Sequence, residues 1–463
     1  MKRSQIVGAV LAIAVLIGMF FVPESIGLSK AGIHTLGVLI AIIIALVTEP
    51  LPIAITCMLG IPLMVIFGCV PNVSQALVGY TNHIWFFVLV SFGISEAIAK
   101  VPLPKRLLVL LIRVFGAKTK NILLALMLCA AVMSSIMSNV ATTAVLVSVV
   151  LNFLNVYEDE EIRKKSGKAF MIGLPLASMI GGMMTPAGSP LNLLGIDFLA
   201  QEGIVISFVE WMMIGIPIAV VSLFACWFLL GKIFKPAELE KEKIETYIQS
   251  LQIPKTFDFQ EKYVIVVVCA LFILWVLSSW IPALQITVVG TIGLAFLFLP
   301  KIAVLEWKEF AGKVSWASIL LIGTMMSLGT TLSANGVSEW IINLFFKSQP
   351  NLPVALIVGM LCIIVFVLLI PIPIGPALIS MLGGPFLSLA ASWGYSPVVL
   401  IMPLVICGSC CFLLPLDTVP LLTYVTGYYK MGEVPKVSLP TQIVIAVCVS
   451  IWLPIALGIL GYM

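Results

Sequence analysis

The chain has 463 residues, of which 61% are hydrophobic and 10% are charged, and its mean hydropathy is +1.19. This composition excludes a soluble globular protein and indicates an integral membrane protein. The apolar runs are too long for the strands of a membrane barrel, so we expect an all-α polytopic protein.

Apolar segments follow one another along the whole chain, with one hydrophilic stretch at 232–262 that is too short for a domain. The expected division is 1–80, 81–210, 211–310, 311–432 and 433–463. The first, third and last parts should hold simple membrane-spanning helices, at 6–22, 34–47, 53–70, 211–230, 264–280, 288–299 and 441–460. We expect about eleven spanning helices in total, together with two hairpins that enter the membrane and return.

The first hairpin is predicted at 121–157, a stretch of 37 residues without a charged side chain. About 20 residues cross a bilayer, so this stretch is too long for one helix and long enough for two half-helices. Six polar residues lie in its middle: Ser134, Ser135, Ser138, Asn139, Thr142 and Thr143. Because a polar group without a partner is costly in hydrocarbon, this patch should line a cavity.

Basic residues indicate which ends of the spans face the cytoplasm. They cluster at 2–3, 100–120, 163–168, 232–262 and 301–313, and the positive-inside rule places these segments and the N-terminus inside. Both ends of the first hairpin then lie on the cytoplasmic side, and both ends of its counterpart lie outside.

Two landmarks recur at a nearly constant spacing. Trp85 and Trp316 begin similar segments 231 residues apart, and Thr185 and Thr418 lie in similar segments 233 residues apart. The same offset places a second hairpin at about 353–392. The chain therefore reads as an inverted repeat, in which each copy also contains a broken helix, at about 170–199 and 399–429.

The breaks in these helices predict a binding site. Residues 185–192 contain two prolines and a glycine, so they free backbone groups inside the membrane. The N-termini of half-helices carry a partial positive charge and bind anions without a lysine or arginine, while the freed oxygens can ligate Na⁺. Candidate substrate-binding residues are those of the first tip, both breaks and the second tip: Ser138, Asn139, Thr142, Ser189, Pro190, Gly375, Pro376 and Thr418.

The motifs SNVATTA (138–144), GGMMTPAGSPLN (181–192) and GSCCFLLPLDTVPLLTYVTGYYKMG (408–432) together resemble those of the divalent anion:sodium symporter family. The resemblance extends over nearly the whole chain. It implies a dimeric secondary transporter of di- and tricarboxylates or sulfate. In that family the hairpin-containing domain moves like an elevator against a fixed scaffold, and each hairpin tip carries a Ser-Asn-Thr motif.

By this resemblance, Ser134, Ser138, Asn139 and Gly188 would form the first Na⁺ site, with Val140 in place of the motif's threonine. The second half departs from the pattern. Gly375, Pro376 and Ala377 stand where the second Ser-Asn-Thr motif is expected, and Leu421 replaces an asparagine.

Asp417 stands where the family has a small residue beside the ion. An ionisable residue at a break inside the membrane marks function by default. Asp417 would hold a second cation or a proton, repel a second substrate charge, or cap a half-helix.

The expected function is secondary transport of small anions, C4-dicarboxylates in the first place, coupled to Na⁺ or H⁺. A cation-independent anion exchanger and a carrier of sulfate or monocarboxylates are the alternatives, and a channel is a third. We expect no enzyme, since HExxH and a paired nucleophile and histidine are absent. We also expect no organic cofactor and no nucleic-acid partner. The protein should be a homodimer among the lipids of the inner (plasma) membrane.

Overall fold

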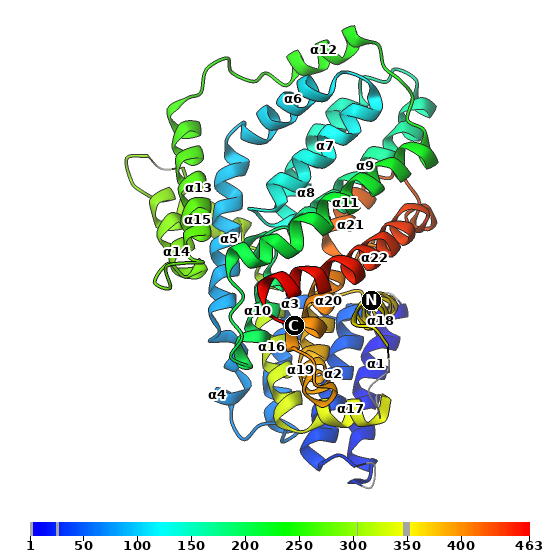
Figure 1. The fold of residues 1–463 in the computed structure, drawn as a ribbon. Coiled ribbons are helices and arrows are strands. Elements are labelled where there is room, and N and C mark those ends of the chain that lie inside the picture. Colours follow the sequence, from blue (N-terminus) through cyan, green and yellow to red (C-terminus); the bar gives the residue numbers. More distant parts are fainter. Residues whose placement is uncertain (1–2, 25–26, 303, 346–351) are drawn as a thin grey trace.

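A computed structural model describes residues 3–24, 27–302, 304–345 and 352–463, and within these ranges all regular structure is helical (Figure 1). The predicted all-α fold class is confirmed. Seven helices of the described chain are long and apolar enough to cross a membrane, namely α2, α5, α11, α13, α16, α19 and α22. The remaining predicted spans correspond to shorter helices or to helices that are broken.

The N-terminal helices form a small bundle at one end of the molecule (Figure 1). They are α1 (Arg3–Gly18), α2 (Lys30–Thr48), α3 (Ile53–Ile66) and the short α4 (Val73–Ala76). Ser29 caps α2 by accepting a hydrogen bond from the Gly32 backbone at 3.1 Å. At the other end of α2, Glu49 has a φ of 47° and starts the turn into α3.

The first repeat follows and contains a long helix, an amphipathic helix, a hairpin and a broken helix. Its helices are α5 (His83–Lys100), α6 (Leu103–Phe115), α7 (Thr119–Ser134), α8 (Asn139–Leu154), α9 (Glu160–Gly182), α10 (Pro190–Gln201) and α11 (Phe208–Phe234). The hairpin is α7–α8, and the break between α9 and α10 holds a short 3-10 turn, η4 (Pro186–Gly188).

A second flanking group connects the repeats. It consists of α12 (Lys241–Ser250), α13 (Phe259–Leu277), α14 (Ile286–Leu297) and α15 (Trp307–Lys313). Helix α12 is polar and lies with α6 to α9 at the end of the molecule opposite the N-terminal bundle (Figure 1).

The second repeat has the same order of helices as the first. It comprises α16 (Trp316–Ala334), α17 (Val337–Phe345), α18 (Val354–Leu368), α19 (Gly375–Trp393), α20 (Pro397–Gly408), α21 (Thr418–Tyr424) and α22 (Pro435–Leu460). The second hairpin is α18–α19, and the second break separates α20 from α21.

Contacts between the repeats are reciprocal. Helix α10 of the first repeat packs on α19 and α20 of the second, and its counterpart α21 packs on α8 and α9 of the first. Likewise α16 packs on α2 and α3, and its counterpart α5 packs on α13 and α14. Such an exchange is what a two-fold axis between the repeats requires, and it brings both tips and both breaks to the centre of the molecule.

A buried ion pair joins α6 to α13. Arg106 of α6 donates to Glu261 of α13 at 3.0 Å, and the side chain of Glu261 is 1% exposed. Removing Glu261 leaves the charge of the mostly buried Arg106 without its ion-pair partner, which costs up to about 3–5 kcal/mol. We therefore expect Glu261→Ala to lower the thermal unfolding midpoint by several degrees in detergent.

The exposed pair between Lys164 and Glu160, one turn apart on α9, provides the control. Because water already solvates both of its charges, Lys164→Ala should leave the midpoint unchanged. Equal midpoints for the two variants would contradict a stabilising role of the buried pair.

Candidate substrate and cation site

The first hairpin turns at residues 135–138, where α7 ends and α8 begins. The backbone N–H of Ser138 donates to Ser95 Oγ of α5 at 3.1 Å, which fixes the tip against that helix. Ser138 is the N-cap residue of α8, but its side chain makes no capping bond. Its hydroxyl is therefore available to a ligand at the N-terminus of α8, where the helix carries a partial positive charge.

Asn139 directs one end of its side-chain amide at three oxygens. This end lies 2.5 Å from Ser134 Oγ and 3.3 Å from the carbonyl oxygens of Ser178 and Gly188. With the nitrogen turned toward them, the amide donates to all three. With Oδ1 turned toward them, the Ser134 hydroxyl donates to it and the two carbonyl oxygens face it as acceptors, so a cation between these oxygens would stabilise that orientation. Hydroxyl, amide and carbonyl oxygens are ligands of the kind that Na⁺ takes at a helix break.

The break between α9 and α10 is built around the hairpin tip. Thr185 donates its hydroxyl to the Ser135 carbonyl at 2.5 Å and accepts a bond from the Gly188 backbone at 3.1 Å. Asn192 donates to the carbonyl oxygens of Gly182 and Thr185, both at 2.8 Å. Its own Oδ1 is buried and has no hydrogen-bond partner in the described structure.

Gly188 lies where a larger residue has no room. A Cβ at this position would lie 2.6 Å from the Gly182 carbonyl oxygen and 3.0 Å from that of Ser134. We expect Gly188→Ala to displace the carbonyl groups around Asn139, with an overpacking cost of about 1–3 kcal/mol. If these groups ligate Na⁺, NaCl should raise the unfolding midpoint of the wild type relative to choline chloride, and the variant should lose this increase.

The matched control is Gly458→Ala on α22, where an added Cβ meets nothing within 4 Å. It should keep the full response to NaCl. A Gly188→Ala variant that responds to NaCl like the wild type would contradict the assignment of the cation site.

The second hairpin tip lies directly against the first half. A Cβ at Gly375 would lie 2.7 Å from the Gly408 carbonyl oxygen and 2.9 Å from Leu191 Cδ1, so this contact requires glycine. Helix α19 begins here with Gly375-Pro376-Ala377, and this tip offers backbone groups without a hydroxyl or amide side chain.

Asp417 occupies the N-cap position of α21, yet its carboxylate makes no capping bond to the helix backbone. It instead accepts a hydrogen bond from the hydroxyl of Thr418 at 2.9 Å. The carboxylate thus lies at the N-terminus of α21, where the partial positive charge of a helix favours an anion.

A cavity of about 420 Å³ lies between these tips and breaks on one side and α2, α3, α5 and α16 on the other. The first residues of α8, α10, α19 and α21 line it, so four helix N-termini converge on one space. No lysine or arginine lines it among the described residues, and its ionisable groups are Glu49 and Asp417. Helix dipoles and hydroxyl groups are thus the features that favour an anion.

The structure brings most of the candidate residues together. All predicted substrate-binding residues except Thr142 line the cavity, and so does Asp417. Ser134 and Gly188 lie behind the cavity wall, in contact with Asn139. Thr142 is buried one turn inside α8, where its hydroxyl has no hydrogen-bond partner among the described residues and does not line the cavity.

Four polar lining residues were not among the candidates. Glu49 follows α2, Ser91 belongs to α5 and Ser318 belongs to α16, and all three lie outside the tips and breaks and carry no motif. Ser409 lines the cavity with a buried hydroxyl that has no hydrogen-bond partner in the described structure. It stands 231 residues after Ser178, so the repeat spacing could have identified it.

Comparisons with known proteins show which family the chain belongs to. The family model described as the sodium:sulfate symporter transmembrane region matches residues 3–460. A sodium-dependent dicarboxylate transporter, SdcS, of Staphylococcus saprophyticus is 26% identical over 493 residues and covers 98% of this chain and 93% of its own. SdcS of Staphylococcus aureus strain USA300 is 25% identical over 489 residues, with coverage of 99% and 93%.

One solved structure, that of Neisseria gonorrhoeae MtrF, is similar in fold. Its TM-score is 0.57 at 14% sequence identity, and the match covers 83% of this chain and 82% of the other.

The fold and the matched family together define a multi-pass membrane transporter, not an enzyme. The chain belongs to the sodium:sulfate symporter family, which is the divalent anion:sodium symporter family that its motifs resemble.

Proposed function

We propose that the protein is a secondary active transporter that carries a small anion, a C4-dicarboxylate in the first place, together with Na⁺. The observation that carries this proposal is the convergence of four helix N-termini on a cavity that no described lysine or arginine lines. The dicarboxylate is taken from the names of the SdcS relatives, and the size of the cavity is compatible with a small ligand.

The assigned roles follow from position. Ser138, Asn139, Ser189 and Thr418 provide polar side chains to the anion, and Pro190, Gly375 and Pro376 shape helix starts around it. Ser134, Ser138, Asn139 and Gly188 hold Na⁺, and Asp417 takes a second cation or a proton. Bound Na⁺ beside the cavity would lower the cost of bringing a negative charge next to two carboxylates.

Transport would proceed by an elevator movement. The hairpins and broken helices would move as one body against a scaffold formed by α1–α5 and α12–α16. The protein would be a homodimer in the plasma membrane, with its N-terminus in the cytoplasm.

The test is uptake into proteoliposomes with Na⁺ and pH gradients imposed separately. Na⁺-driven accumulation of a labelled C4-dicarboxylate, with counterflow from preloaded vesicles, is the expected result. Uptake that follows neither gradient would overturn symport, and the absence of counterflow would indicate a channel.

An anion exchanger without net cation coupling is the second candidate. One observation favours it: the second tip, at Gly375 and Pro376, lacks the side chains that a second cation site would use. In that case uptake would require preloaded anion and would ignore both gradients. A panel of sulfate, mono- and dicarboxylates in the same assay then identifies the substrate.

A further inference from the structure

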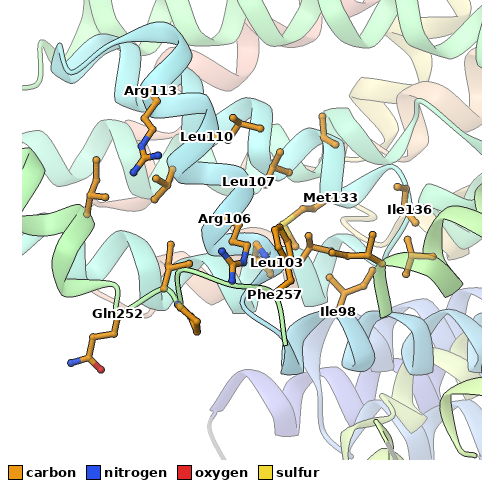
Figure 2. A pocket seen from close by; sticks show the side chains of 18 of the residues that line it. Ile98, Leu103, Arg106, Leu107, Leu110, Arg113, Met133, Ile136, Gln252 and Phe257 are labelled. Carbon is orange, nitrogen blue, oxygen red and sulfur yellow. The ribbon is translucent and has the colours of Figure 1, made fainter. Parts of the chain in front are cut away.

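A second, larger cavity of about 980 Å³ shares no lining residue with the proposed substrate site (Figure 2). One of its walls is formed by α6 and the end of α7, and the other by α13 and the segment between α12 and α13. The proposed function uses none of its residues.

The walls of this cavity are apolar and partly open. On the hairpin side they include Val132, which is 45% exposed, with Ile136 and Met137. On the α13 side they include Val268 and Cys269. A pocket of this size is at the upper end of the range of about 300–1,000 Å³ that holds small organic ligands. Apolar side chains around such a space favour a hydrocarbon occupant.

The segment between α12 and α13, residues 251–258, is called the strap below. It lines the cavity and is held in place by Arg106. The guanidinium of Arg106 lies 4.2 Å from the centre of the Phe257 ring and donates to the Thr256 carbonyl at 3.1 Å. Its charge is already neutralised by Glu261. Arg106 thus holds the strap and α13 against α6 and so maintains the shape of the cavity.

Two other cations at the cavity have no such partner. Arg113 of α6 and Lys255 of the strap are exposed, and neither forms an ion pair in the described part of the chain. Among the described residues, no acidic one lines the cavity. The nearby Asp258 caps α13 by accepting from the Glu261 backbone at 2.7 Å. The rim therefore carries positive charge beside an apolar interior.

We propose that this cavity binds an anionic phospholipid, with an acyl chain between α7 and α13 and the headgroup phosphate on Arg113 and Lys255. Charge complementarity selects this occupant over a zwitterionic lipid or a second copy of the chain. Basic pockets between membrane helices bind acidic headgroups in this way.

The position of the cavity gives the lipid a consequence for transport, and this part rests on the proposed function. Ile136 and Met137 immediately precede Ser138 at the hairpin tip, and Val268 belongs to the opposite wall. A lipid chain between them would contact the first hairpin, which is proposed to move, and α13, which is proposed to stay fixed. The content of anionic lipid should then set the rate of transport.

Binding is tested without transport, by native mass spectrometry of the full-length protein from mixed micelles of phosphatidylglycerol and phosphatidylcholine. The wild type should retain phosphatidylglycerol preferentially. Arg113→Gln with Lys255→Gln should lower this preference on the order of 30-fold, since each cation contributes about 1 kcal/mol. Lys165→Gln with Lys241→Gln removes the same charge from exposed sites outside the cavity and should change nothing.

A space-filling variant tests the acyl-chain part. Cys269→Trp on α13 should reduce retention of both lipids, because the indole occupies the cavity. Equal retention of both lipids by the wild type, or equal preference in all charge variants, would overturn the proposal. Cys269 is the exposed one of the ten cysteines, so a thiol cross-linker that joins two copies through it would show that another chain covers the cavity and would also overturn it.

Uptake is then compared in vesicles with and without phosphatidylglycerol. A rate that depends on this lipid in the wild type but not in the Arg113, Lys255 double variant supports regulation. Equal dependence in both proteins would overturn regulation, whereas loss of uptake in every vesicle would count against the proposed function only.

Discussion

Asn139→Ala is expected to reduce Na⁺-dependent uptake by at least roughly 100-fold. The amide of Asn139 lies at the wall between the oxygen cluster and the cavity, so it would contact both proposed ligands. A hydrogen bond to a charged group contributes about 1.5–3 kcal/mol, and every 1.4 kcal/mol is a factor of ten, so loss of both contacts is sufficient. The measurement is initial uptake in proteoliposomes at equal amounts of inserted protein.

Ser148→Ala on the same helix provides the control for this variant. Its hydroxyl is exposed and bonds only to the Val145 carbonyl of its own helix, at 2.9 Å. It should transport like the wild type. If Asn139→Ala kept normal uptake and normal Na⁺ dependence, both roles assigned to Asn139 would be wrong.

Asp417→Asn is expected to transport without responding to one of the two imposed gradients. The replacement keeps the shape of the side chain and its hydrogen bond with Thr418 but removes the charge that a second cation or a proton would neutralise. Uptake is measured with the Na⁺ gradient and the pH gradient imposed in turn. The gradient that drives the wild type but not the variant identifies the ion at Asp417.

Asp197→Asn serves as the matched variant outside the cavity. Asp197 of α10 accepts hydrogen bonds from Asn82 at 3.1 Å and from Gln201 at 3.3 Å, and it does not line the cavity. It should keep the wild-type response to both gradients. The same response in Asp417→Asn would leave that residue with a role in positioning α21 alone.

The repeats and the breaks were predictable from the sequence because they rest on local rules. Two prolines and a glycine within residues 185–192 are too many for a continuous helix, and the 231- and 233-residue spacings align the two halves before any contact is known. For this reason the breaks near Thr185 and Thr418 were predicted to meet, and residues of both breaks do line one cavity.

Residues that depend on packing between distant helices were not predictable in this way. Glu49 reaches the cavity only because the α2–α3 turn lies beside the hairpin domain, and nothing near it in the sequence signals this. Thr142 shows the opposite case. It belongs to a polar motif, but it lies one turn farther along α8 than Asn139, where its side chain is fully buried and does not line the cavity.

The second tip begins with Gly375 and Pro376 and has no hydroxyl or amide side chain there, so the two tips differ although the fold is symmetric. A linear dicarboxylate that lies across the cavity would meet amide and hydroxyl side chains at one end and mainly peptide N–H groups at the other. Its two ends, chemically identical in solution, would become distinguishable once bound. The protein should then reject changes at one carboxylate and accept an ester, an amide or a longer chain at the other, so half-modified substrates would bind in a single orientation.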